Sequence, residues 1–157
     1  MRIIAGKNKG RKLFGFEGDK IRPTSDKARE ALFAILGNIN QSTFLDLCSG
    51  TGAIGLEAHS RGAIVTMVDK DHESVALATK NAKLVSFDGK IIKSEAINFL
   101  KTTDKSFDII FVDPPYHLDL GPQVLQTVQD RNLLNEGGVL IYERIFPRII
   151  LQTKLKR

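Results

Sequence analysis

From residue 44 onward the chain alternates short apolar stretches with segments of helical length, and this alternation constrains the fold more than any other feature. The apolar stretches predict five strands, at Phe44–Leu47, Ile64–Val68, Lys90–Lys93, Phe107–Val112 and Val139–Tyr142. The segments between them predict helices over residues 53–61, 71–84, 95–101 and 121–131. Parallel strands need such crossover helices, which bury both faces of the sheet. We therefore expect an α/β fold with a doubly wound, mostly parallel sheet.

The residues before this sheet predict an extension. Arg2–Ala5 and Lys12–Phe16 are short apolar stretches, and Lys7–Gly10 between them is typical of a turn. Residues 1–21 are therefore expected to form a β-rich extension.

A helix should follow the extension, because apolar residues recur there at i, i+3, i+4, i+7 and i+8. These residues are Ala28, Ala31, Leu32, Ile35 and Leu36, with Thr24 or Ser25 as the N-cap and Gly37 as the end. No repeat or linker interrupts the chain. We expect one domain over residues 1–157, with its core at residues 44–143.

Charge is distributed unevenly along the 157 residues. Residues 1–30 contain nine Lys and Arg against four Asp and Glu, whereas residues 31–143 contain nine against fourteen. Residues 144–157 contain five Lys and Arg and no acid. Basic segments at both ends indicate a polyanionic partner. The candidate phosphate contacts are Arg2, Lys7, Lys9, Arg11, Lys12 and Arg22.

Composition excludes several classes of protein. Cys48 is the single cysteine, so an internal disulfide is impossible, and no Cys/His cluster indicates a metal site. No apolar run approaches the roughly 18 residues that span a bilayer, and residues 1–7 lack the core of a secretory signal. We expect a soluble cytoplasmic protein. His59 and His72 fall on predicted helices and are expected at the surface.

A glycine loop follows the first predicted strand. Gly50, Gly52 and Gly55 match the G-x-G-x-x-G dinucleotide fingerprint, and Asp69 ends the second strand 19 residues after Gly50. Binding of a nicotinamide dinucleotide is therefore one interpretation. Asp46, four residues before the first glycine, favours S-adenosylmethionine instead, because a carboxylate there can accept from an ammonium group. The chain is also too short for a full dinucleotide site and a substrate domain.

A second motif, Asp113-Pro114-Pro115-Tyr116, ends the fourth predicted strand. Ligands in such folds bind beyond the carboxyl ends of the strands, so this motif should lie beside the glycine loop. The Asp113 carboxylate and the Pro114 carbonyl can accept hydrogen bonds from an exocyclic amine of a nucleobase, and Tyr116 can stack on the base. The motif thus predicts methyl transfer to such an amine. His117, directly after Tyr116, is a further candidate near the base.

Three segments together resemble the RsmD family of bacterial enzymes, which methylate N2 of one guanine in 16S rRNA. They are Arg22–Phe33, Asp46–Ala58 and Asp113–Tyr116, and the opening residues 1–6 and 10–13 are also similar to that family. The resemblance covers residues 1 to about 143. It implies a Rossmann-like fold of the class I S-adenosylmethionine-dependent methyltransferases, that cofactor, and 16S rRNA in the 30S subunit or its assembly intermediate as substrate.

The resemblance also implies roles for individual residues. Asp69 would bind the ribose, and Glu95 with Ala96 the adenine edge. The target guanine would lie at Asp113, Pro114 and Tyr116. The methionine end of the cofactor would lie against Asp46, Ser49, Gly50, Thr51 and Gly52.

The chain departs from the family pattern at a few places. Cys48 and Ser49 replace a common Phe-Ala pair, and Glu95 stands where Asp is frequent. Only fourteen residues follow Glu143, so the antiparallel strand pair that ends family members should be shortened or absent. We expect a monomer in which an exposed sheet edge permits self-association.

Two other functions remain open from the residues alone. An adenine-N6 methyltransferase of DNA shares the Asp-Pro-Pro-Tyr motif. A non-catalytic RNA-binding or assembly protein with a relict cofactor pocket is the second.

Overall fold

A six-stranded sheet forms the centre of the molecule in the computed structural model, which describes residues 1–16, 26–115, 119–143 and 149–151. The strand order is β3-β2-β1-β4-β5-β6. The strands are β1 (Thr43–Leu47), β2 (Ile64–Asp69), β3 (Lys90–Lys93), β4 (Phe107–Val112), β5 (Leu134–Tyr142) and β6 (Ile149–Leu151). The helices are α1 (Asp26–Leu36), α2 (Ala53–Ser60), α3 (His72–Leu84), α4 (Ala96–Thr102) and α5 (Gly121–Arg131).

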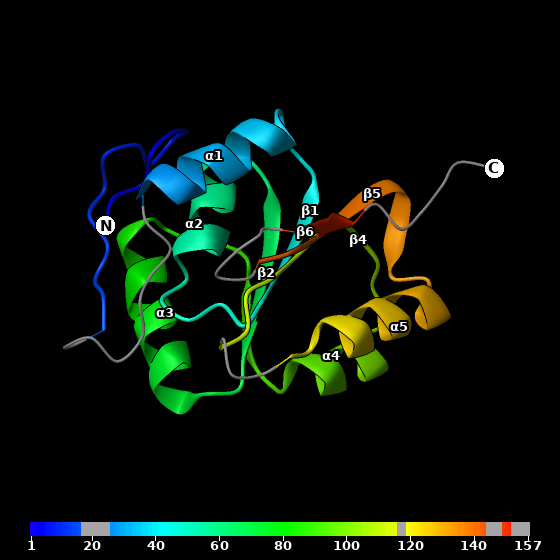
Figure 1. Cartoon of the computed structure of the whole chain (residues 1–157). Helices are drawn as coiled ribbons and strands as arrows, with labels where there is room; N and C mark the ends of the chain where they lie inside the picture. Colours follow the sequence, from blue (N-terminus) through cyan, green and yellow to red (C-terminus); the bar gives the residue numbers. More distant parts are fainter. Residues whose placement is uncertain (17–25, 116–118, 144–148, 152–157) are drawn as a thin grey trace.

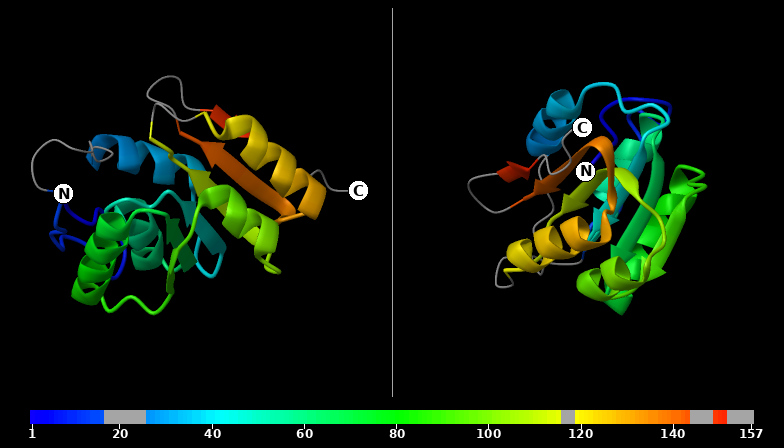
Figure 2. Two further views of the ribbon diagram at one scale, coloured as in Figure 1. Left: turned by 90° about the horizontal axis from the view of Figure 1, so that it is seen from below. Right: turned by 90° about the vertical axis from the view of Figure 1, so that its right-hand side faces the viewer.

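Strands β1 to β5 are parallel, as the alternation of elements predicts. Helices α4 and α5 cover one face of the sheet, and α1, α2 and α3 lie on the other side (Figures 1 and 2). Successive residues of β1 show this division, because Phe44 belongs to the core under α2 and α3 while Leu45 belongs to the core under α4 and α5. The prediction of a doubly wound sheet is confirmed.

The carboxyl-terminal part of the sheet differs from the predicted strands. Strand β5 begins at Leu134, five residues before the predicted start at Val139, because its pairing with β4 shifts register between Phe107 and Ile109. Gly137 absorbs this irregularity with a φ of +77°. A sixth strand, β6, pairs antiparallel with β5 over three residues. A short terminal strand is thus present, and the parallel sheet has an antiparallel edge.

Helix α1 ends as predicted. Gly37 has a φ of +69°, and its N–H donates to the Phe33 carbonyl at 3.0 Å. The expected N-caps, Thr24 and Ser25, lie outside the described residues.

The N-terminal segment, defined here as residues 1–16, is not the β-rich extension that its sequence predicts. Its β structure is one antiparallel bridge between Arg2 and Lys12. Leu13 N–H donates to the Met1 carbonyl at 2.8 Å, and Ile3 and Leu13 are buried. Packing of these two side chains against the domain therefore contributes to holding the segment in place.

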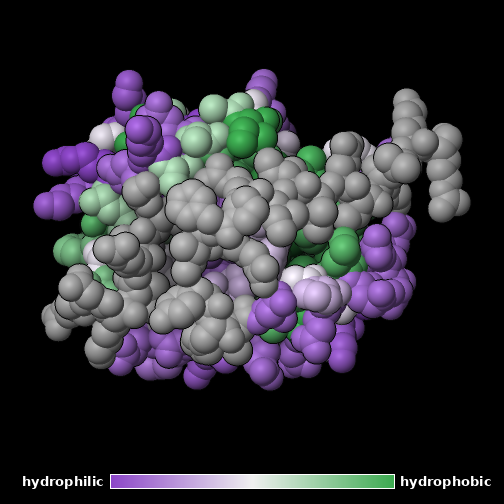
Figure 3. Space-filling view, in the orientation of Figure 1, coloured by the Kyte–Doolittle hydropathy of each residue, from purple (hydrophilic) through white to green (hydrophobic). Residues whose placement is uncertain are grey.

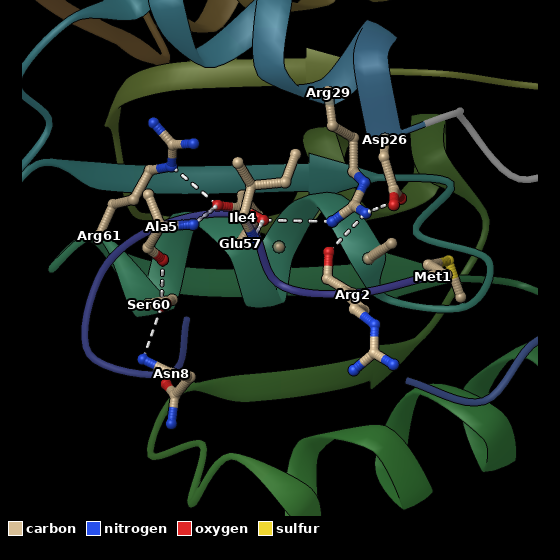
Figure 4. Close-up of polar contacts among 12 residues, drawn as sticks. Met1, Arg2, Ile4, Ala5, Asn8, Asp26, Arg29, Glu57, Ser60 and Arg61 are labelled. Carbon is tan, nitrogen blue, oxygen red and sulfur yellow. Dashed lines mark hydrogen bonds and ion pairs between the residues drawn. The ribbon is translucent and has the colours of Figure 1, made fainter. Parts of the chain in front are cut away.

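A buried carboxylate, Glu57 of α2, fastens this segment to the domain (Figure 4). Its Oε1 accepts from Ile4 N–H at 2.8 Å and from Arg29 Nη1 at 3.2 Å. Its Oε2 accepts from Ala5 N–H at 3.1 Å and from Arg61 Nε at 2.9 Å. Four donors thus satisfy the two carboxylate oxygens, so burial leaves neither oxygen unpaired.

Arg29 of α1 completes this arrangement. Its side chain is fully buried, and Nη2 donates to the Arg2 carbonyl at 2.7 Å and to Asp26. The pair Arg29 and Glu57 therefore joins α1, α2 and the N-terminal segment in one network (Figure 4).

The expectation that His59 is a surface residue is wrong. Every residue of α2 is buried, because the sheet lies on one side and the N-terminal segment on another, and His59 is only 2% exposed. Its ring packs edge-on against Phe87, and Nε2 lies 3.4 Å from the Val85 carbonyl. Burial and the nearby Lys7 lower the pKa of His59. His72, on α3, is exposed as predicted.

None of the helices in the described part of the chain is long and apolar enough to cross a membrane.

Replacing Glu57 with Gln should destabilise the protein by about 3–5 kcal/mol, because the buried guanidinium group of Arg29 would lose its buried counter-charge and keep only the exposed Asp26. Urea unfolding measures this change. Glu30→Gln, at an exposed acid of α1, is the matched control and should change stability by less than about 0.5 kcal/mol. A loss for Glu57→Gln no larger than that of the control would contradict the role of this network.

His59 should make folding stability depend on pH. Because its folded-state pKa is lowered, the unfolded chain binds a proton more readily; the contribution is complete above about pH 6.5 and is lost as pH falls below it. The free energy of unfolding should therefore decrease on acidification, and His59→Gln should reduce that decrease. His72→Gln is the exposed control. The prediction fails if both variants follow the wild-type profile.

Candidate functional site

Three carboxylates meet at the carboxyl edge of the sheet, where the strand order reverses between β1 and β4. Asp46 lies in β1, Asp69 ends β2, and Asp113 directly follows β4. The β1–β4 register, Asp46 opposite Phe111 and Leu47 opposite Val112, brings Asp113 beside the end of β1. The sequence prediction that the two motifs lie side by side is confirmed by this register.

The glycine loop leaves β1 through several left-handed residues. Cys48, Gly50 and Gly52 have φ of +64°, +55° and +86°. Ser49 N–H donates to the Val68 carbonyl at 3.0 Å, so the loop stays attached to β2. Gly52 then caps the N-terminus of α2. The chain thus turns sharply from strand to helix, and the loop lies over the edge of the sheet.

The glycines of the loop have different tasks. A Cβ on Gly55 would lie 2.6 Å from Met67 Sδ, and one on Gly52 would lie 3.3 Å from Ala78 Cβ. These two positions therefore serve close packing of α2 against its neighbours. A Cβ on Gly50 would meet nothing within 4 Å. Gly50 is thus the glycine whose backbone a ligand can approach.

Asp46 is buried, with 1% of the residue exposed. Its Oδ2 accepts from Gly55 N–H at 3.0 Å, which fastens the first turn of α2 to β1. Burial raises the pKa of Asp46 well above its usual range, against the lowering effect of the Gly55 bond, and the charges of Asp113 and Asp69 raise it further. An additional positive charge at this point would relieve the cost of ionising it.

Asp69 is held by the backbone of the loop. Its Oδ2 accepts from Gly50 N–H at 2.9 Å, and its Oδ1 accepts from Asp71 N–H at 2.9 Å. Each carboxylate oxygen has a second lone pair, so both can still accept from a diol. The two backbone bonds orient the group for that contact.

Cys48 lies among the same three acids. Burial, followed by the charges of Asp69, Asp46 and Asp113, raises the pKa of its thiol to about 12. The thiol is therefore protonated at neutral pH and is not a nucleophile.

The arrangement fits the cofactor that the family resemblance implies. S-Adenosylmethionine carries a sulfonium and an ammonium group, and the acidic cluster of Asp46, Asp69 and Asp113 suits such charges. Ser49 Oγ is buried and has no hydrogen-bond partner among the described residues. Gly50 leaves open space beside the loop. These are features of a ligand site rather than of a closed core.

The other predicted residues that the structure describes in this part of the molecule lie at or near the same edge. Glu95 is exposed and caps α4, which follows β3, without a side-chain bond of its own to the helix, and Ala96 is buried beside it. Pro114 is buried and Pro115 exposed after β4. Thr51 contacts the N-terminal segment through a bond from Oγ1 to Met1 Sδ of 3.9 Å. Tyr116, His117 and Arg22 lie outside the described residues.

The predicted phosphate contacts within the N-terminal segment are all exposed, namely Arg2, Lys7, Lys9, Arg11 and Lys12. Hydrophilic side chains gather on this side of the molecule, at the upper left of Figure 3. The segment therefore combines a buried apolar side, through Ile3 and Leu13, with a cationic outer side.

Sequence reasoning missed Asn81, which links the site to this segment. Asn81 of α3 is fully buried, and its Nδ2 donates to the Thr51 carbonyl at 2.9 Å and to the Phe14 carbonyl at 3.0 Å. The available signal was a polar residue on the apolar face of α3, between Ala78 and Val85. Glu57, a lone acid in the apolar helix α2, carried a similar signal.

Comparison with known proteins assigns the chain to a family. The family model described as Conserved hypothetical protein 95 (Cons_hypoth95) matches residues 1–153. This chain belongs to the RsmD family. The predicted membership is therefore confirmed.

Two curated relatives of this RsmD-family chain are called Ribosomal RNA small subunit methyltransferase D. The protein of Haemophilus influenzae is 35% identical over 150 residues, which cover 91% of this chain and 78% of the relative. The protein of Escherichia coli K12 is 34% identical over 146 residues, which cover 91% and 74%.

Solved structures resemble the RsmD-family chain along most of its length. A hypothetical protein of Thermus thermophilus superposes with a TM-score of 0.80 at 30% identity, covering 90% of this chain and 84% of that one. The structure called "Putative methyltransferase yhhF from Escherichia coli" superposes with a TM-score of 0.80 at 31% identity, covering 90% of this chain and 79% of that one. The predicted methyltransferase fold is confirmed.

Asp46 should lower the stability of the RsmD-family chain as pH rises. Because the pKa of Asp46 is raised in the folded state, the contribution of its protonated carboxyl group to stability is fully present below about pH 4. That contribution is lost as pH rises through the folded-state pKa. Asp46→Asn, which can still accept from Gly55 N–H, should remove this loss and be at least as stable as wild type at pH 8. Urea unfolding at pH 5 and pH 8 measures it. A variant less stable than wild type at pH 8 would contradict the assignment.

Proposed function

We propose that this chain transfers the methyl group of S-adenosylmethionine to the exocyclic N2 amine of a guanine in 16S rRNA. The observation that carries the proposal is the position of Asp113 and Pro114, beyond β4, next to the glycine loop beyond β1. Methyltransferase relatives with about a third of residues identical over 91% of the chain support it.

The glycine loop and its acids would hold the cofactor. Gly50 offers backbone approach to the methionine end, and Ser49 Oγ offers a buried hydroxyl. Asp46 would bind the ammonium group directly or through water, Asp69 the ribose hydroxyls, and Glu95 with Ala96 the adenine edge. When bound, S-adenosylmethionine supplies an electrophilic methyl group on a cationic sulfur. The acidic surroundings retain that cation but repel anions, which argues against a nicotinamide dinucleotide with its pyrophosphate.

Asp113 and Pro114 would hold the target amine. The lone pair of an exocyclic amine is delocalised into the ring, so the nitrogen is a weak nucleophile. Hydrogen bonds from its N–H groups to the Asp113 carboxylate and the Pro114 carbonyl favour a tetrahedral nitrogen with its lone pair directed at the methyl carbon. The φ angles of Pro114 and Pro115 are restricted, which keeps the accepting carbonyl in position.

Bond formation then needs no prior deprotonation. The nitrogen becomes acidic only as the new N–C bond forms, and it loses its proton to Asp113 or to water. The products are the methylated guanine, the thioether left by the cofactor, and one proton. Tyr116 would stack on the base.

The substrate would be the 30S subunit or its assembly intermediate, and the protein would act as a monomer. The exposed cations of the N-terminal segment would contact phosphate. Phosphate contacts offset the cost, a few kcal/mol, of taking a guanine out of its stack. Binding should therefore weaken steeply with salt.

The test is to incubate the wild-type protein with methyl-labelled S-adenosylmethionine and unmodified 30S subunits, then to map the label. Label at N2 of a guanine in 16S rRNA is the expected result. Label at adenine N6 of duplex DNA would instead identify the alternative enzyme. Absence of cofactor binding by a folded protein would favour the RNA-binding module with a relict pocket.

Substitution of Asp113 should lower turnover, whereas substitution of Asp46 should weaken cofactor binding. Asp113→Ala should lower kcat at least about 100-fold with an unchanged Kd for S-adenosylmethionine, because it removes one of two acceptors for the amine. Asp46→Asn should raise that Kd about 10- to 100-fold, because it removes a charge-assisted bond. Calorimetric titration and single-turnover methylation measure the two effects. The role of Asp113 is wrong if Asp113→Ala retains most of the wild-type rate.

A further inference from the structure

Phe14 is an exposed aromatic side chain within the cationic N-terminal segment. The large hydrophobic side chains that stand exposed in the described chain are Phe14 at 45%, Ile35 at 57% and Ile64 at 56%. Of these, Phe14 alone is aromatic and lies among the predicted phosphate contacts, two residues after Lys12. Single exposed hydrophobics are normal at protein surfaces, so exposure by itself does not make a site. Three further observations distinguish Phe14.

The backbone of Phe14 is held rigidly by a buried side chain. Asn81 Oδ1 accepts from Phe14 N–H at 2.7 Å, and Asn81 Nδ2 donates to the Phe14 carbonyl at 3.0 Å. Asn81 itself is fully buried. Both backbone groups of Phe14 are therefore fixed, and the ring projects outward from an anchored position rather than from a loose loop.

The same side chain connects Phe14 to the glycine loop. Asn81 Nδ2 also donates to the Thr51 carbonyl at 2.9 Å, and Thr51 lies between Gly50 and Gly52. The side-chain amide of Asn81 thus bridges the backbone of Phe14 and the proposed cofactor loop. The ring is therefore anchored to the same loop beside which the target nucleotide would be methylated.

A cation accompanies the ring. The ammonium nitrogen of Lys80, the residue before Asn81 in α3, lies 3.9 Å from the centroid of the Phe14 ring. Arg11 and Lys12 are exposed on the same segment, and Arg2 pairs with Lys12 across the bridge. An anchored aromatic ring with a cation against it, on a segment that carries further cations, is an arrangement by which proteins bind unpaired nucleotides, with the base on the ring and the phosphate on the cations.

We propose that Phe14 and Lys80 form a stacking platform for an unpaired nucleotide that flanks the target guanine in the RNA. A base stacks on the exposed part of the Phe14 ring, and the Lys80 ammonium group contacts the adjacent phosphate. The inference rests on the proposed function for its choice of RNA as the ligand. It extends the RNA surface from the N-terminal segment onto α3, and it gives Asn81 the task of positioning that surface relative to the glycine loop.

The test measures binding of a short single-stranded RNA that carries one guanine next to the fluorescent base 2-aminopurine, whose emission is quenched when it stacks. Phe14→Leu should raise the Kd about 5- to 100-fold and abolish the quenching, and Phe14→Trp should restore both. Lys80→Gln should lower the salt slope of binding by about 0.7, whereas Phe14→Leu should leave that slope unchanged.

Ile35→Ser, at the exposed aliphatic residue of α1, is the matched control and should bind this RNA as the wild type does. The free energy of unfolding, measured in urea, and the Kd for S-adenosylmethionine should be unchanged in Phe14→Leu. A loss of RNA binding would then not result from unfolding or from a damaged cofactor site. Equal Kd and equal quenching for Phe14→Leu and wild type would overturn the platform.

Methylation of 30S subunits by the wild type distinguishes the two proposals. If the wild type methylates rRNA but Phe14→Leu binds and reacts normally, the platform fails and the proposed function stands. If the wild type binds the RNA with quenching that depends on Phe14 but transfers no methyl group, the platform stands and the proposed function fails.

Discussion

The buried carboxylate of Glu57 is the interaction on which the rest of this structure depends. It accepts from two backbone N–H groups of the N-terminal segment and from one arginine on α1 and one in the turn after α2. An ionised group can remain in the core only because each of its oxygens has two donors. The glycine loop leads directly into α2, which carries Glu57. The hydrogen bonds that fix the N-terminal segment to Glu57 therefore also help to fix the position of the proposed cofactor site.

Charge is separated in space as well as along the chain. Asp46 in β1, Asp69 at the end of β2 and Asp113 directly after β4 meet at one edge of the sheet. Burial there, followed by the charges of the neighbouring acids, raises the pKa of Asp46 and of Cys48. The cations of residues 1–12 stay on the outer side of a segment whose inner side is apolar. A cationic cofactor and an anionic RNA therefore have separate surfaces, and Asn81 spans the short gap between them.

The local sequence pattern was sufficient to predict the parallel strands, but not where β5 begins or that β6 is present. The alternation from residue 44 onward predicts all five parallel strands, and the spacing of Asp46, Gly50 and Asp113 predicts which strand ends carry the site. The irregular start of β5 depends on its register with β4, and β6 depends on pairing with β5; neither leaves a periodic signal of its own. His59 is a polar residue on a short helix, which predicts exposure, but α2 is covered on more than one side, so the residue is buried.

The sequence by itself determined the fold class, the family and the residue types of the site, because strand periodicity, loop glycines and the Asp-Pro-Pro motif act through local backbone geometry. Only the tertiary structure decided which polar residues are buried and what they join. Apart from the local pairs of Arg29 with Asp26 and of Glu57 with Arg61, the partners of Asn81, Arg29 and Glu57 lie 27 to 67 residues away in the chain. A hydrogen bond to a distant backbone group depends on how helices and segments pack, and no local pattern encodes that packing.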